Sequence, residues 1–280
     1  VGPLIRPPSG PLESALKELE PGEEWAVMPR LHVDGNPHLV GPGVKWGVRP
    51  GSVTHWTEFF GPMLAVMEAR NLDEAIDLVN DTGYGLTSGL ESLDDREQEH
   101  WQQRIRAGNL YINRPTTGAI VLRQPFGGMG KSAVGPGIKA GGPNYVAPLM
   151  IFRDTPLSAP PTASRFSSGS PDSQMLADLH QALGNYLAVT KSSPFAAEDL
   201  DRILLAIDSY QHWAAEEFHA EHDHFRLLGE DNFRRYRPVG HLRVRIHGDD
   251  NVFDVFARAT AARAAGCRTT VSSPPGLAGT

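Results

Sequence analysis

The spacing of apolar and polar positions predicts strands and helices that alternate along the first half of the chain. "WAVMPRLHV" (25–33) has the apolar content of a strand. "LDEAIDLVNDT" (72–82) has apolar residues at helical spacing and acidic residues in its first turn, which suit the helix dipole. A second helix is predicted over 92–108, with Asp94 or Ser92 as its cap and Gly108 at its end.

The strand-like segment "NLYINR" (109–114) follows the second helix, and such βα alternation is typical of an α/β domain. We assign residues 1–152 to this first domain. Residues 153–173 are rich in Pro, Ser, Ala and Thr and predict a flexible linker. Residues 174–280 predict a second domain, in which two helices precede a strand, a helix and a strand.

Charge and composition exclude several classes of protein. The net charge of -7 is divided between the two halves, so neither half offers a basic face for nucleic acid. No apolar run approaches the roughly 18 residues that span a bilayer. The single cysteine, Cys267, excludes an internal disulfide and a multi-cysteine zinc site, and it fits a reducing cytoplasm. We therefore expect a cytoplasmic protein without a membrane span.

Two groups of reactive side chains have a plain structural interpretation. Cys267 lies in "AAGCRTT" before a predicted strand, where a cysteine is usually a buried small apolar residue and not a nucleophile. "EEFHAEHDHF" contains three histidines, but only His219 and His222 share a helical face with each other and His224 does not. Clustered histidines alone indicate zinc weakly, so we interpret this segment as a solvated helix end and assign no metal.

Seven glycines lie within residues 124–146, "QPFGGMGKSAVGPGIKAGGPNYV". Gly130-Lys131-Ser132 matches the end of a P-loop, but the first glycine of that motif is replaced by Pro125, which has no N–H for a phosphate. A nucleoside triphosphate binder is therefore disfavoured. The alternatives are a turn whose bare backbone N–H groups hold a small anion, such as a carboxylate, and a surface loop without a ligand.

Two long segments, "TEFFGPMLAVMEARNLDEAIDLVNDTGYGLTSGL" (57–90) and "AGNLYINRPTTGAIVLRQPFGGMGKSAVGPGIKAGGPNYV" (107–146), resemble the aldehyde dehydrogenase family. The motifs "TGAIV", "QPFGG" and "KAGGPNY" resemble its delta-1-pyrroline-5-carboxylate (L-glutamate gamma-semialdehyde) dehydrogenases, above all the form found in bifunctional proline-utilisation proteins. The resemblance implies that residues 1–152 are the C-terminal part of the α/β catalytic domain.

The resemblance also implies a reaction and its residues. A cysteine thiolate attacks L-glutamate gamma-semialdehyde, a hydride passes to NAD+, and water releases glutamate, as a step of proline catabolism. Glu58 matches the carboxylate that binds the nicotinamide ribose, and Phe60 matches the aromatic residue beside the nicotinamide. Gly141 and Gly142 match the backbone donors for the substrate's α-carboxylate, and Leu149 replaces an aromatic residue near the end of that loop.

Without the resemblance, Glu58 would be interpreted as a solvated surface acid and Phe60 as an ordinary core residue. The family's nucleophilic cysteine, general-base glutamate and main dinucleotide-binding domain match no part of this chain, and we expect them before Val1. The chain then belongs to a longer protein and is inactive alone. Whether a proline dehydrogenase domain precedes it is left open.

The segment that ends in "CRTTVSSPPG" resembles the extra C-terminal domain of long proline-utilisation proteins. It has no lysine where the family's nucleotide-binding segment meets the adenosine ribose, so we interpret it as a degenerate Rossmann-like α/β segment that does not bind NAD. The alternative to an enzyme is a non-catalytic assembly or substrate-channelling module. "VAPLMIF" (146–152) predicts a hydrophobic strand that needs a partner, and relatives use this region for assembly, so we expect a homo-oligomer.

Overall fold

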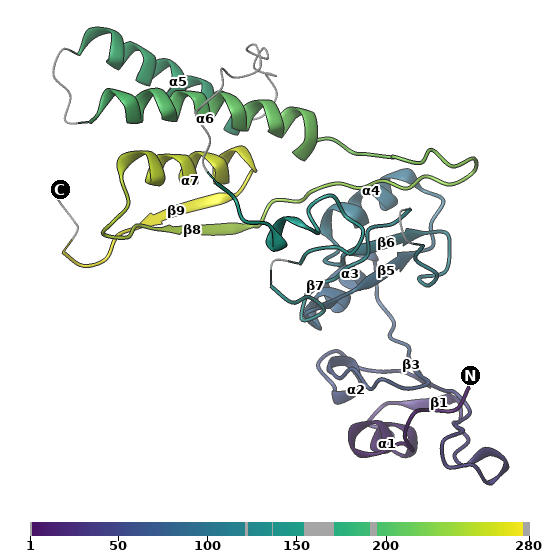
Figure 1. Cartoon of the computed structure of the whole chain (residues 1–280). Coiled ribbons are helices and arrows are strands. Elements are labelled where there is room, and N and C mark those ends of the chain that lie inside the picture. The colour runs from purple at the N-terminus through teal and green to yellow at the C-terminus, as the bar shows by residue number, and fades with distance from the viewer. Residues whose placement is uncertain (1, 121–122, 136, 154–170, 191–194, 277–280) are drawn as a thin grey trace. The chain divides into compact units, whose positions relative to one another are not determined.

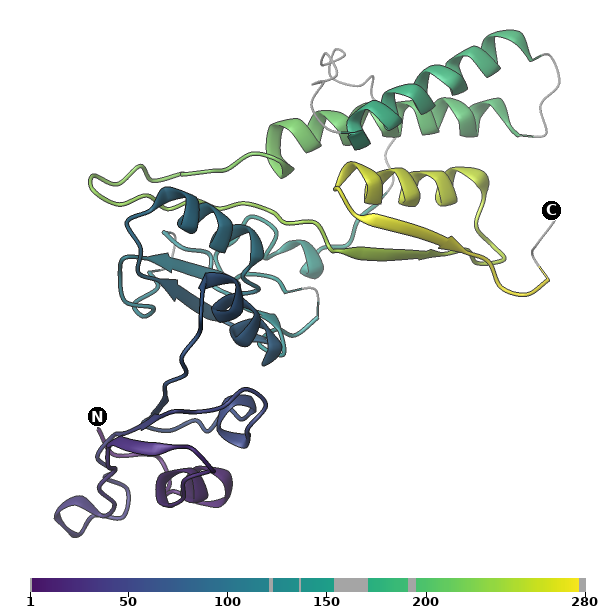
Figure 2. The same ribbon diagram turned by 180° about the vertical axis from the view of Figure 1, so that it is seen from behind.

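The computed structural model is drawn from two opposite sides in Figures 1 and 2. It divides the chain into two compact units, Val1–Met150 and Ile151–Thr280. Among the described residues, no helix combines the length and apolar character needed to cross a membrane. The residues that the structure describes are 2–120, 123–135, 137–153, 171–190 and 195–276.

The first unit begins with a small three-stranded sheet. Its central strand, β2 (Gly43–Trp46), pairs antiparallel with β1 (Glu24–Val27) and parallel with β3 (Met63–Ala65). The strand predicted over 25–33 is therefore correct only at its start. It stops because Pro29 has no N–H for a sheet, and a 3-10 turn follows. Three short helical segments flank the sheet: α1 (Gly10–Lys17), η1 (Val33–Gly35) and α2 (Val53–Trp56).

An ion pair lies inside this sheet. Lys45 of β2 is only 2% exposed, and its Nζ lies 2.9 Å from a Glu23 carboxylate oxygen and 3.3 Å from Thr54 Oγ1. Burial acts to raise the pKa of Glu23, but hydrogen bonds from Thr54, the Glu20 amide and Lys45 outweigh it and leave that pKa lowered. The lowered pKa keeps Glu23 ionised, and the ion pair joins β2 to the turn before β1 and to α2.

Two predicted helices cover the second half of this unit. The helix α3 (Leu72–Asp81) confirms the first, and the helix α4 (Asp95–Arg104), capped by Asp94, confirms the second. However, α4 ends at Arg104 and not near Gly108, because the backbone becomes extended at Ile105, which is buried. Both helices pack through Ile76 and Trp101 onto a parallel pair of strands. The strands of this half are β4 (Tyr84–Gly85), β5 (Thr87–Leu90), β6 (Asn109–Ile112) and β7 (Met129–Gly130).

The strand β6 confirms the prediction for "NLYINR", but the strand predicted over 146–152 is wrong. Ala147–Leu149 forms the 3-10 helix η2, in which the Leu149 amide donates to the Val146 carbonyl at 2.9 Å. Pro148 favours this turn and removes a donor that a strand would need.

The second unit stacks helices on a two-stranded sheet (Figures 1 and 2). The parallel strands β8 (His241–Arg245) and β9 (Arg268–Ser272) are joined by α7 (Val252–Ala264). The helices α5 (Pro171–Val189) and α6 (Ala197–Trp213) pack on the other side of α7, and α6 continues as a turn of π-helix, η3 (Ala214–Phe218). Buried apolar residues form this core: Leu176, Leu200, Ile203, Ile207 and Ala264.

The linker predicted over 153–173 lies mostly outside the described residues, which exclude 154–170. The helix α5 already begins at Pro171, within the last positions of that predicted segment. The predicted order of two helices, a strand, a helix and a strand is the order that the second unit shows.

We expect the substitution Lys45→Met to lower the free energy of unfolding of the first unit by about 3–5 kcal/mol, because it leaves the Glu23 carboxylate buried without its cation. The double variant Lys45→Met/Glu23→Leu should recover most of this loss. Urea unfolding followed by hydrogen exchange at the amides of β1, β2 and β3 measures the free energy of unfolding of both variants. Equal stability of the single and double variants would contradict an ion pair at this position.

Candidate functional site

The glycine tract passes against the start of β6 at very short range. A Cβ atom added to Gly108 would lie 1.8 Å from the Gly127 carbonyl oxygen, so the two backbones require glycine there. The Asn109 side chain, which is buried, links the same segments. Its Nδ2 donates to the Pro125 carbonyl at 3.1 Å, and its Oδ1 accepts from the Gly127 amide at 3.1 Å. Asn109 therefore fixes the tract to the sheet.

Lys139 adds a second link between these segments. Its Nζ donates to the carbonyl oxygens of Gly108 at 2.5 Å and Gly127 at 2.7 Å. Next to it, Phe126 and Ala140 exchange two backbone hydrogen bonds of 2.9 Å each. Burial lowers the pKa of Lys139 to about 8. A partly buried ammonium held by two carbonyls thus lies directly before the predicted carboxylate turn.

The predicted turn is present and faces solvent. Gly141 adopts a left-handed φ of 77° and is exposed, and a Cβ atom there would meet nothing within 4 Å. The Gly142 amide donates to the Lys139 carbonyl at 2.9 Å, so this turn already uses one of the two predicted donors. Among the hydrogen bonds given for the described residues, none uses the Gly141 amide. Leu149 is 81% exposed.

The P-loop interpretation, disfavoured by the sequence, is excluded by local structure. Lys131 Nζ donates to the Thr82 carbonyl at 2.8 Å, and Ser132 Oγ accepts from the Gly85 amide at 3.1 Å. These side chains secure the short β4–β7 pair. No helix follows them up to η2 in the part of the chain that the structure describes, so no helix N-terminus is available for a phosphate.

Glu58 and Phe60 lie in the loop between α2 and β3, and both are exposed. Phe60 is 85% exposed and has a left-handed φ of 50°, which is strained for an aromatic residue. Such strain persists only where the surroundings impose it, and it is often found at ligand sites. The prediction of an ordinary core position for Phe60, made from the residues alone, is therefore wrong.

The helix α2 positions the start of this loop. The Glu20 carboxylate accepts from the amides of Val53 at 3.3 Å and Thr54 at 3.0 Å, and the bond from Thr54 is the main reason that the pKa of Glu20 is lowered. His55 Nε2 lies 2.9 Å from the Leu78 carbonyl oxygen, which ties α2 to α3. Among the described residues, no hydrogen bond, ion pair or ring contact joins Glu58 or Phe60 to the Gly141–Gly142 turn.

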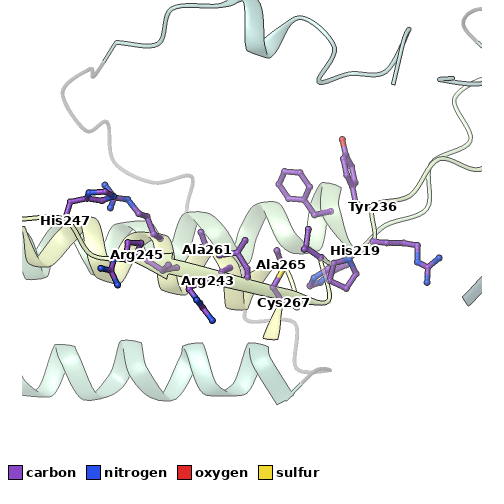
Figure 3. Close-up of a pocket in the computed structure, with 16 residues that line it drawn as sticks. His219, Tyr236, Arg243, Arg245, His247, Ala261, Ala265 and Cys267 are labelled. Carbon is purple, nitrogen blue, oxygen red and sulfur yellow. The ribbon is translucent and has the colours of Figure 1, made fainter. Parts of the chain in front are cut away.

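The second unit contains a separate hollow between β8 and α7, shown in Figure 3. Its volume is about 890 Å³. Small and apolar side chains, including Ala261, Ala265 and Cys267, line it together with arginines such as Arg243 and Arg245. Cys267 is 4% exposed, which confirms that it is a buried small residue.

The start of α7 is unfavourable for a dinucleotide phosphate. Asn251 and Asp254 form a reciprocal capping box that uses the helix's own N–H groups. Asp250, beside them, accepts from the His247 amide at 2.8 Å and pairs with Arg258 at 2.9 Å. Carboxylates therefore occupy the end of the helix where a Rossmann-like βα unit would bind pyrophosphate.

The three histidines of "EEFHAEHDHF" make no metal site among the described residues. His222 Nε2 lies 2.9 Å from the Glu217 carbonyl oxygen, and its ring stacks on His224 at 5.6 Å. Arg234 pairs with the Glu217 carboxylate at 2.9 Å. A cation, Arg234, thus occupies the position beside this carboxylate.

Residues 17–152 match the family model of the aldehyde dehydrogenase family. The predicted resemblance is thereby confirmed. In addition, 101 residues of the chain are 52% identical to the bifunctional protein PutA of Rhizobium meliloti, covering 35% of this chain and 8% of that protein. A 1-pyrroline-5-carboxylate dehydrogenase of Geobacillus thermodenitrificans is 41% identical over 113 residues, which is 40% of this chain and 22% of that enzyme.

One solved structure resembles nearly the whole chain. Proline Utilization A (PutA) from Corynebacterium freiburgense has a TM-score of 0.73 and 38% identity, and the likeness covers 96% of this chain and 25% of that one. Because neither unit alone makes up 96% of the chain, the likeness includes residues of both. The chain thus spans a quarter or less of the length of these three relatives.

Sequence reasoning missed Asn109 and Lys139, which hold the glycine tract together. A signal for Lys139 was present: it is the single charged residue between Lys131 and Arg153, in a tract that otherwise offers backbone and small side chains. Nothing in the spacing indicated that the Gly108 and Gly127 carbonyls would meet its ammonium, because that contact depends on how β6 and the tract cross.

We expect Gly108→Ala to lower the free energy of unfolding of the first unit by about 3 kcal/mol or more, because the new methyl group and the Gly127 carbonyl overlap. Gly184→Ala is the matched control, since its Cβ meets nothing within 4 Å in the helix α5, and it should stabilise by up to about 1 kcal/mol. Denaturant unfolding measures both changes, and a neutral Gly108→Ala would show that the close approach is absent in solution.

Proposed function

We propose that this chain is part of an NAD-dependent L-glutamate gamma-semialdehyde dehydrogenase that acts in proline catabolism. The observation that carries the proposal is the Gly141–Gly142 turn, with Gly141 exposed, in a chain that has a relative named 1-pyrroline-5-carboxylate dehydrogenase. In this proposal the chain supplies contacts to the cofactor and to the substrate's carboxylate. The nucleophilic cysteine and the general base belong to other parts of the longer protein.

Glu58 and Phe60 are proposed to contact the nicotinamide half of NAD+. No hydrogen bond given for the described residues engages the Glu58 carboxylate, so both of its oxygens can accept from ribose hydroxyls. The exposed Phe60 ring offers an apolar face to the nicotinamide. These residues fit the cofactor chemically; NAD+ itself accepts the hydride, while the chain binds and orients it.

The turn is proposed to bind the substrate's α-carboxylate. The left-handed Gly141 leaves its amide accessible to an anion. The Gly142 amide bonds the Lys139 carbonyl, so it contributes to carboxylate binding only if it shares its hydrogen or releases that carbonyl. Leu149 is proposed to contact the aliphatic part of the substrate in place of the family's aromatic residue.

The proposed longer protein is cytoplasmic and forms a homo-oligomer, and a fused proline dehydrogenase domain is proposed because one relative is the bifunctional protein PutA. The apolar residues on either side of the boundary between the two units support assembly, since Leu149, Ile151 and Phe152 are 81%, 89% and 75% exposed. Light scattering on the longer protein tests the oligomer.

We expect the isolated 280-residue chain to form no NADH from L-glutamate gamma-semialdehyde, whereas the longer protein does. In the longer protein, Glu58→Gln should raise KM for NAD+ about tenfold and leave KM for the aldehyde nearly unchanged, the scale of one hydrogen bond to a charged group. Glu68→Gln, another exposed carboxylate of the same unit, is the control. Turnover by the isolated chain, or equal effects of the two substitutions, would contradict the proposal.

A further inference from the structure

Lys139 is a partly buried lysine of the first unit for which the described residues provide no acidic partner. Its ammonium bonds two carbonyl oxygens, and burial is the single cause of its lowered pKa. By contrast Lys45, which is buried, pairs with Glu23 at 2.9 Å. Keeping an ammonium partly out of water without an anion is costly, so its charge has a role beyond filling space.

We propose that Lys139 is a positioning residue for the carboxylate turn, and that its charge completes the binding of an α-amino acid's carboxylate there. This inference rests on the proposed function and assigns to it a residue that the sequence did not indicate. The class of ligand is a small carboxylate with an aliphatic chain, such as L-glutamate.

The first part of this role is mechanical. The Lys139 carbonyl accepts the Gly142 amide, which closes the turn, while its Nζ holds the Gly108 and Gly127 carbonyls at the start of β6. One residue therefore forms the base of the turn and anchors it to the sheet. Without the side chain, the anchor consists of the neighbouring Phe126–Ala140 backbone pair.

The second part is electrostatic. The ammonium belongs to the first residue of the turn, so its distance from the turn is limited to one lysine side chain. The groups packed against it are the backbone carbonyls of β6 and of the glycine tract, and no charged side chain of the described residues contributes to its pKa. A carboxylate at Gly141 would therefore meet a cation that no protein anion among the described residues neutralises.

Protonation of Lys139 and binding of the carboxylate should favour each other. A bound carboxylate favours the protonated lysine, so ligand binding should raise the pKa of Lys139 above its value of about 8. Conversely, the affinity for the carboxylate should fall as the pH rises from 7 to 9, because the ammonium loses its proton over this range. Reciprocity between proton and ligand requires both effects together.

The experiment titrates the 280-residue chain with L-glutamate and follows the ¹⁵N–¹H signals of Gly141 and Gly142 by NMR at pH 7 and pH 9. Lys139→Met should weaken binding at pH 7 about tenfold, the scale of one nearby opposite charge at a protein surface. Lys139→Arg should keep most of the affinity and bind equally at both pH values, because arginine stays charged. Any difference that this variant still shows between pH 7 and pH 9 measures the effect of titrating glutamate's own amine. Labelled lysine Cε signals report the Lys139 pKa with and without glutamate.

Lys131→Met is the matched control. Lys131 lies in the same tract, is exposed, and bonds a single carbonyl, so its removal should leave glutamate binding unchanged. Hydrogen exchange at the β6 amides shows whether each variant is folded. A folded Lys139→Met variant that binds glutamate as tightly as the parent chain would overturn the role of Lys139 and leave the proposed function standing. A parent chain whose Gly141 and Gly142 signals do not respond to glutamate would overturn the substrate site, and the inference with it.

Discussion

Two backbones that meet without side chains between them set the geometry of the first unit. Where the glycine tract crosses β6, the Gly108 and Gly127 main chains lie too close for a Cβ atom, and Asn109 and Lys139 satisfy the polar groups that this contact would otherwise bury. Buried backbone groups need partners, so these two side chains stabilise the crossing. The turn at Gly141 owes its location to that crossing.

The sequence predicted elements best where a single physical signal was strong. The helix α3 has apolar positions at helical spacing and an acidic first turn, and it was predicted almost to its ends. The helix α4 was correct in type and in its Asp94 cap, but its end was not, because burial of Ile105 extends the chain before Gly108 can act as a stop. Local chemistry thus identified helices, while tertiary packing decided where this one ended.

Other features of the structure could not be predicted from the pattern of residues. "VAPLMIF" is apolar throughout and suggested a strand, yet Pro148 turns it into a 3-10 helix. For the candidate site, the resemblance identified Gly141 and Phe60, and the backbone at both proved to be left-handed. The hydrogen bond that already engages the Gly142 amide, and the two carbonyls around Lys139, depend on three-dimensional crossing and could not be read from spacing.

The second unit keeps the form of a βαβ unit, while the start of its helix is filled by its own carboxylates and caps. Its single cysteine lies at the end of α7, 4% exposed, in a chain with no other thiol. A thiol-modifying reagent can react with this chain at Cys267 only, and the native packing shields that sulfur. The rate of alkylation at Cys267 therefore reports how often α7 and β9 separate. The reaction leaves the first unit unmodified.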